Sequence, residues 1–262
     1  MTTTAETRVP RVPGRGYGLA QAARMEWIKL RSLRSTWLTL AIAVAASAGI
    51  ALAIGSSSTT SGGMFVGNTL VGMLIGVLLI GVVGVLAMTS EYTSGTIRAT
   101  FAAAPRRLRV LAAKAAVVGA VALITGEAAA FLSFFAGCMA LRHGITAPAL
   151  SQPGVLRAIV LTGASLSLIA LFGLGLGAII RHTAAAITVV VGIVCAGGPL
   201  NLAVRPYLPI YIVSHSLSAT TPLCRPGAAS CWLSAWSGLG MLAVYAAIAM
   251  VLGALILAWR DA

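Results

Sequence analysis

The sequence predicts an all-α integral membrane protein with six transmembrane helices, and three observations lead to this fold class. First, 59% of the 262 residues are hydrophobic and only 9% are charged, whereas a soluble domain carries about 25% charged residues. Second, the apolar residues form six runs that are each long enough to cross a bilayer, which takes about 20 residues. Third, the cations gather beside these runs. Most of the surface must therefore face lipid.

The six spans are expected to be helices, because every backbone polar group in lipid must be bonded within the protein. Strands of a transmembrane barrel would alternate polar and apolar residues, and these runs do not alternate. The spans are predicted near residues 37–54, 64–88, 115–141, 156–180, 184–204 and 239–259.

The placement of Lys and Arg predicts that both termini are cytoplasmic. Seven of these residues precede the first span, none lies in the loop at 55–63, and five lie between the second and third spans. Cytoplasmic loops carry an excess of Lys and Arg. The net charge of +13 thus reflects membrane topology, and we expect no nucleic-acid partner.

The chain before the first span divides into two parts. Residues 1–18 are polar and rich in Pro and Gly, which is typical of a disordered tail, and a six-span membrane domain is predicted over residues 19–262. Residues 19–35 place Leu19, Ala23, Trp27 and Leu30 at helical spacing, and we expect an amphipathic helix in the membrane interface, in contact with lipid. Its anchoring residues are predicted to be Trp27, Lys29, Arg31 and Arg34. The alternative is a basic flank that only orients the first span. A cleaved signal peptide is not expected, since the apolar run begins far from the N-terminus and no cleavage site follows it.

The segment from Glu91 to Lys114 is longer than a chain reversal needs. Thr93 and Ser94 are suited to capping a helix start, and Gly95 permits a close backbone approach. Ile97 and Phe101 then share one face of a short helix that Pro105 ends. The residues alone leave two interpretations open, a docking helix for another protein and a long cytoplasmic loop.

The same segment resembles the first cytoplasmic loop of ATP-binding-cassette exporter permeases of the type-two superfamily. The similar residues are E-Y-T-S-G-T-I-R from Glu91 to Arg98, A-A-P-R-R to Arg107, and A-A-K ending at Lys114. The E-W-I-K-L-R run from Glu26, the Pro-rich residues 206–222 and the W-R-D ending at Asp261 are also similar to this family.

The resemblance implies the membrane subunit of an exporter in the bacterial plasma membrane. A separate ATPase subunit would bind ATP and Mg, this chain would hold no cofactor, and a second permease chain, identical or different, would complete the path. The resemblance assigns coupling to the ATPase to Glu91, Thr93, Ser94, Gly95, Thr96, Ile97, Arg98, Phe101, Pro105 and Arg106.

Other chemistry finds little support in the sequence. Lys29 and Lys114 are the only lysines, and neither follows a Gly-rich loop or precedes Ser or Thr, so the chain has no Walker A motif. Four cysteines without C-x-x-C spacing and three scattered histidines predict no metal site. No nucleophile triad is recognisable, and we expect no catalytic residue. Cys224 and Cys231 share an outer loop, where either a disulfide or two free thiols can exist.

Glu127 is the one carboxylate near the middle of a predicted span. An intramembrane charge is costly and usually functional. Two roles remain open, a polar clamp between helices and a group that lines a solute or cation path. The pairs Gly72/Gly76 and Gly173/Gly177 have the G-x-x-x-G spacing that permits close helix crossing.

Three functions follow from these patterns. The first is an ATP-driven exporter subunit that moves an apolar or amphiphilic solute by alternating access. The second is a proton- or cation-coupled secondary transporter that uses Glu127. The third is a membrane anchor or sensor that recruits a cytoplasmic partner without moving solute.

Overall fold

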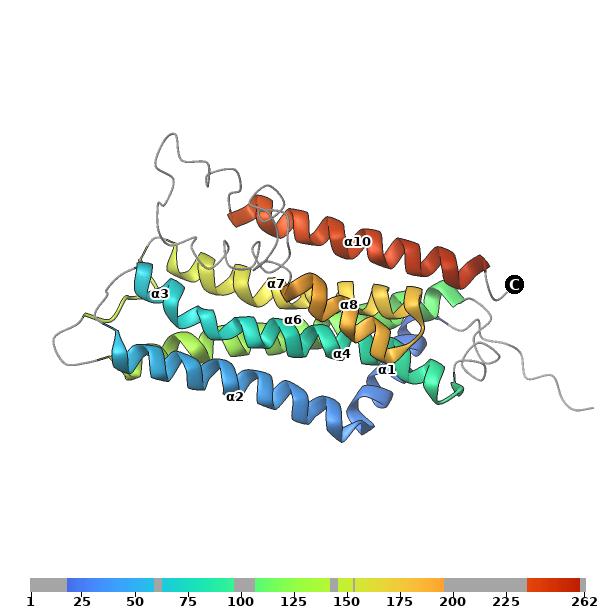
Figure 1. Cartoon of the computed structure of the whole chain (residues 1–262), viewed down its shortest axis with the longest axis horizontal. Coiled ribbons are helices and arrows are strands. Elements are labelled where there is room, and N and C mark those ends of the chain that lie inside the picture. Colours follow the sequence, from blue (N-terminus) through green and yellow to red (C-terminus); the bar gives the residue numbers. More distant parts are fainter. Residues whose placement is uncertain are drawn as a thin grey trace, which may run out of the picture.

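The fold is described by a computed structural model for residues 18–58, 63–96, 107–141, 146–152, 154–195 and 235–259. Within these ranges all regular secondary structure is helical, which confirms the all-α part of the predicted fold class. The long helices run side by side along the longest axis of an elongated bundle (Figure 1). Their bounds are α1 Leu19–Ser32, α2 Arg34–Ser57, α3 Gly63–Thr69, η1 Leu70–Gly72, α4 Met73–Thr93, α6 Arg107–Met139, α7 Val155–Ile180, α8 Thr183–Cys195 and α10 Ala235–Trp259.

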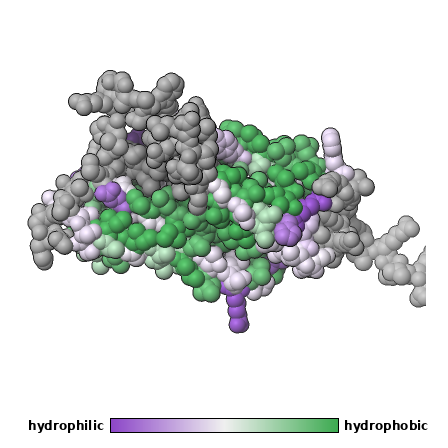
Figure 2. All heavy atoms as spheres, in the orientation of Figure 1, coloured by the Kyte–Doolittle hydropathy of each residue, from purple (hydrophilic) through white to green (hydrophobic). Residues whose placement is uncertain are grey.

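In the part of the chain that the structure describes, five helical stretches are long and apolar enough to cross a membrane. They are α2, the run from α3 through η1 into α4, α6, α7 and α10, and each coincides with a predicted span. The remaining predicted span, 184–204, begins in α8, a shorter apolar helix that ends at Cys195. The last residues of that predicted span lie outside the described part of the chain. Apolar residues cover most of the helical surface visible in Figure 2, as a lipid-facing bundle requires.

Helix α7 is the centre of the bundle and packs against α4, α6 and α10. Its crossing with α4 depends on glycine, because a Cβ at Gly173 would collide with the carbonyl of Gly81, and one at Gly84 with the carbonyl of Ala170. A Cβ at Gly72 would lie 2.7 Å from the Ser47 carbonyl on α2. The close crossings predicted from the G-x-x-x-G pairs are therefore present.

Two helices begin earlier than the hydropathy of the sequence suggests. Helix α6 starts at Arg107, eight residues before the predicted span, and α2 starts at Arg34. The difference has a simple cause, since the apolar run marks only the part of a helix that can lie in lipid, while hydrogen bonding continues past it. Between α1 and α2 the helix breaks at Leu33, which has an extended backbone with φ −84° and ψ 93°.

Helices α2, α4, α6 and α7 alternate in direction, and α10 runs the same way as α7, so α1, the end of α4, the start of α6 and the end of α10 lie at one end of the bundle (right in Figure 1). We call it the basic end. Its cations in the described residues include Arg24, Lys29, Arg31, Arg34 and Lys114.

Candidate functional site

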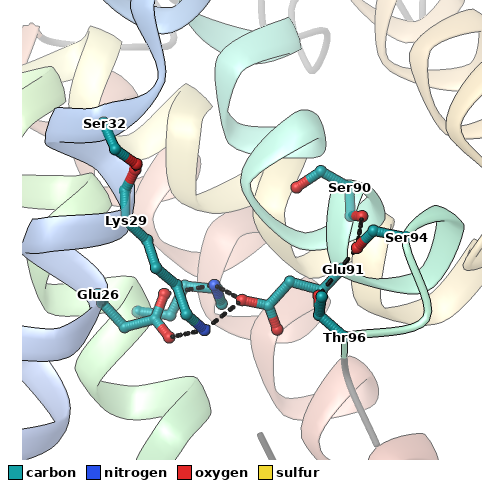
Figure 3. A network of polar contacts seen from close by, with 8 residues as sticks. Glu26, Lys29, Ser32, Ser90, Glu91, Ser94 and Thr96 are labelled. Atoms are coloured by element: carbon teal, nitrogen blue, oxygen red, sulfur yellow. Dashed lines mark hydrogen bonds and ion pairs between the residues drawn. The ribbon is translucent and has the colours of Figure 1, made fainter. Parts of the chain in front are cut away.

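Four charged side chains from three helices meet at the basic end. Lys114 of α6 donates to a carboxylate oxygen of Glu26 on α1 at 2.5 Å and to one of Glu91 on α4 at 2.8 Å. Lys29 of α1 donates to the same Glu91 oxygen at 3.0 Å and to Glu26 at 3.2 Å. Figure 3 shows Glu26 and Lys29 reaching from α1 toward Glu91 on α4. We call these four residues the charge cluster.

The charge cluster is buried although its members are ions. Glu26 is 2% exposed, Lys114 4% and Glu91 7%. Two carboxylates and two ammonium groups give no net charge, and each ion has partners of the opposite sign. This balance matters, because an unpaired buried charge costs several kcal/mol. Removing one member is therefore expected to loosen the junction of all three helices.

Lys29 is the most accessible member, with 35% of its side chain exposed. Burial opposes its charge, but hydrogen bonds and attraction from Glu91 and Glu26 outweigh burial and hold the Lys29 pKa above its ordinary value of 10.5. Lys29 is thus a cation throughout the physiological range. It closes the open side of the cluster.

Glu91 precedes a sharp turn that ends α4. Thr93 is the last residue of this helix, and the Ser94 hydroxyl donates to the carbonyl of Ser90 at 2.8 Å. Gly95 has φ +70°, a left-handed conformation that glycine adopts at little cost. The Ser94 and Thr96 hydroxyls lie 2.8 Å apart (Figure 3). Thus Glu91 fixes the helix from which the predicted coupling segment emerges.

Tyr92 fixes the same turn on another side. The guanidinium of Arg181 lies over its ring, 5.3 Å from the centroid, within cation–π range. Arg181 ends α7 with φ 59° and donates to the Ile256 carbonyl of α10 at 3.4 Å. Adjacent residues of α4 therefore connect to different parts of the bundle, Glu91 to α1 and α6, and Tyr92 to α7 and α10.

A cavity of about 360 Å³ opens beside the charge cluster. All four cluster residues line it, together with Ser94 and Thr96 from the turn and Ser32 from the end of α1. The cavity leaves the turn after α4 partly unpacked.

The structure places the predicted coupling residues in two groups. Glu91 and Thr93 belong to α4, and Ser94, Gly95 and Thr96 form the turn after it. The predicted short helix, with Ile97, Arg98, Phe101, Pro105 and Arg106, lies outside the described residues, as do Cys224 and Cys231.

The predicted anchoring residues also separate into two groups. Trp27, Arg31 and Arg34 are exposed on α1 and at the start of α2. Lys29 instead belongs to the charge cluster. The face of α1 buried in the bundle is Ala22, Glu26 and Leu30, so Leu30 leaves the stripe that was predicted to face the membrane.

Glu127 lies on α6 where this helix crosses α7. A Cβ at Gly163 of α7 would be 2.6 Å from the Glu127 carboxyl carbon, so the carboxyl group occupies the space of an absent side chain. Its Oε2 is buried and has no hydrogen-bond partner among the described residues. Glu127 thus fills a helix crossing without being hydrogen-bonded through this oxygen.

Glu26, Lys114 and Arg181 were not singled out from the sequence as members of one site. The scarcity of charged residues could have indicated the cluster. The chain has only five acids and two lysines, and so few ions in an apolar protein are expected to form ion pairs with one another. Spacing alone could not pair residues from three helices.

Comparison with known proteins identifies one related family. The family model described as ABC-2 family transporter protein matches residues 22–197, which run from within α1 to the end of α8 and include the whole charge cluster. The comparison with curated proteins gives no match.

Proposed function

Because the chain belongs to the ABC-2 transporter family, we propose that it is the membrane permease subunit of an ATP-driven exporter. This subunit would bind its ATPase at the basic end. The carrying observation is the double attachment of the α4 terminus, through Glu91 to α1 and α6 and through Tyr92 to α7 and α10. A partner that moves the turn after α4 would therefore move α1 and α6 as well as α7 and α10. We place the coupling helix in the segment that starts there.

The proposal assigns ATP hydrolysis to a separate subunit. The sequence has no Walker A motif, and both lysines that could contact a phosphate belong to the charge cluster. The partner would bind ATP and Mg. Two permease chains, identical or different, would enclose the path, and its apolar walls suit an apolar or amphiphilic solute.

We further propose six spans with both termini cytoplasmic. The basic end would lie on the cytoplasmic side, following the excess of Lys and Arg there. The start of α1 and the end of α10 share that end of the bundle (Figure 1), which is consistent with an even number of spans. The sixth span would extend α8 beyond Cys195. Alternating access would then be the exchange between two packings of these helices.

Co-purification tests the proposed docking. The tagged chain is expressed with a candidate ATPase subunit that carries a Walker A motif, extracted in mild detergent and captured. We expect the wild type to retain the ATPase in a stoichiometric complex and Arg98→Glu to lose it. Arg31→Glu reverses the charge of an exposed residue on α1. This variant is the matched control and should retain the ATPase. Retention by Arg98→Glu, or solute export without any ATPase, would overturn the proposal.

A second candidate function rests on Glu127, whose Oε2 is buried without a hydrogen-bond partner in the described residues. Such a carboxyl group can carry a proton or bind a cation. A secondary transporter of this kind would lose transport in Glu127→Gln and on collapse of the proton gradient, with no effect of ATP depletion. An exporter driven by ATP gives the opposite dependence. A sensor would bind its partner through the same segment without any solute flux.

A further inference from the structure

A second cavity opens on the outside of the bundle near the basic end. Its volume is about 490 Å³, and it lies where α1, α2 and α6 meet. We call it the lipid-side groove. It is lined by Ala23, Arg24 and Trp27 of α1, Trp37 of α2, and Ala116, Val117, Ala120, Val121, Ile124 and Thr125 of α6. The lining is apolar apart from Arg24 and Thr125.

The lipid-side groove runs along α6. It starts beside α1 and follows α6 from Ala116 to Thr125, away from the basic end. Nine residue steps along a helix span about 13 Å, and one leaflet of the hydrocarbon core is about 15 Å deep. The groove therefore matches the depth over which an acyl chain of one leaflet extends.

The indole rings mark the level of the groove. Trp27 and Trp37 stand edge to face with centroids 6.3 Å apart, and each is 41% exposed. Trp is enriched at the boundary between headgroups and hydrocarbon. Ile124, 70% exposed, lies farther along α6. A molecule in this groove would meet indoles near its headgroup and an aliphatic wall beyond them.

Arg24 supplies the charge at the polar end. It is exposed, and within the described residues it makes no hydrogen bond or ion pair. The nearby carboxylates of Glu26 and Glu91 are already paired with Lys29 and Lys114. Arg24 therefore has no anionic partner among the described residues, and it lies beside a groove that accepts hydrocarbon. A guanidinium group in this position suits a phosphate.

From this arrangement, we propose that the lipid-side groove binds one anionic phospholipid, with an acyl chain against α6 and its phosphate at Arg24. Exposed apolar walls alone would accept any lipid. Arg24, the cation among the lining residues, selects an anionic one. The site is independent of the ATPase partner and would be occupied in the permease alone.

Quenching of tryptophan fluorescence by lipids brominated on the acyl chains tests the site. The full chain carries five tryptophans, and changing Trp232, Trp236 and Trp259 to Phe leaves Trp27 and Trp37 as reporters. The protein is reconstituted in phosphatidylcholine that contains a small fraction of brominated phosphatidylglycerol or brominated phosphatidylcholine. We expect the anionic lipid to quench with about a fivefold higher apparent affinity, the preference that one cation near the membrane surface provides.

Two arginine variants separate a site from general attraction to a basic surface. Arg24→Gln should abolish the preference for the anionic lipid, while Arg24→Lys keeps part of it and shows that the fold is intact. Arg34→Gln removes an exposed cation that does not line the groove and should leave the preference unchanged. Equal quenching by both lipids, or equal losses in Arg24→Gln and Arg34→Gln, would overturn the proposal. Absence of quenching by either lipid would also overturn it and would indicate a protein segment or a second copy in the groove.

Discussion

At the residue scale, the charge cluster is expected to contribute strongly to the free energy of unfolding. Replacing Lys114 by Met leaves the buried carboxylates of Glu26 and Glu91 with too few partners. We expect a loss of about 3–5 kcal/mol in the free energy of unfolding, the range for a broken buried ion pair. The thermal unfolding midpoint in detergent measures the change.

Lys29 provides the internal control for this experiment. It contacts the same carboxylates, but 35% of its side chain is exposed, against 5% for Lys114. Solvent-exposed ion pairs contribute about 0–1 kcal/mol, so Lys29→Met should lower the midpoint much less. Equal losses in the two variants would show that burial does not determine the strength of the cluster.

Alkaline pH should remove the contribution of Lys29 to stability. Its pKa in the folded protein is raised above 10.5, so its contribution to stability is complete below pH 10.5 and is lost as pH rises through the folded value. Arg remains charged in this range. The unfolding midpoint of Lys29→Arg should therefore fall less than that of the wild type in a titration through pH 10.5 and above. A constant difference across that range would contradict the assignment.

At the element scale, the crossing of α6 and α7 can be tested by a double-mutant cycle. A Cβ at Gly163 meets only the Glu127 carboxyl group among its three nearest atoms. Gly163→Ala should cost about 1–3 kcal/mol of stability by overpacking, and Glu127→Ala should remove most of that cost. The unfolding midpoints of the two single variants and the double variant give the coupling.

Gly126 gives the matched comparison for that cycle. A Cβ there would lie 2.5 Å from the backbone carbonyl of Gly163, independently of residue 127. Gly126→Ala should stay equally destabilising with Glu127 present or absent. Rescue of Gly126→Ala by Glu127→Ala would contradict the packing described for this crossing.

The turn after α4 predicts a graded effect at Gly95. Its φ of +70° costs about 1–2 kcal/mol for most L-residues, while Asn tolerates it better. We expect the ATPase activity of the reconstituted complex to fall in Gly95→Val and to be largely kept in Gly95→Asn. Equal activities of these two variants would show that this backbone conformation is not needed for coupling.

The elements themselves were predictable to different degrees. Long apolar runs predicted α2, α4, α6, α7 and α10, because lipid imposes helices of known length. The first residues of these helices were not predictable, since the helical turns around Arg34 and Arg107 lie outside the apolar runs. The inward face of α1 was also not predicted, because Glu26 is a charged residue outside the apolar stripe. It is buried because it pairs with Lys114, which lies far away in the sequence.

At the scale of the whole molecule, the end of α4 is attached to α1 and α6 through Glu91 and to α7 and α10 through Tyr92. Family membership and the apolar helices make it a transport protein of the membrane. The coupling segment stays a prediction that rests on local motifs, whereas the charge cluster depends on three helices meeting and could not be predicted from such motifs. The proposed mechanism depends on where the ATPase binds.

Site-directed photo-crosslinking tests that claim most directly. A photoreactive amino acid replaces Phe101 in the proposed coupling segment or Ser58, which follows α2 at the opposite end of the bundle. Both variants are expressed with the ATPase and irradiated in intact membranes. The account predicts a crosslinked ATPase from position 101 and none from position 58. Crosslinking from position 58, or from neither position, would contradict it.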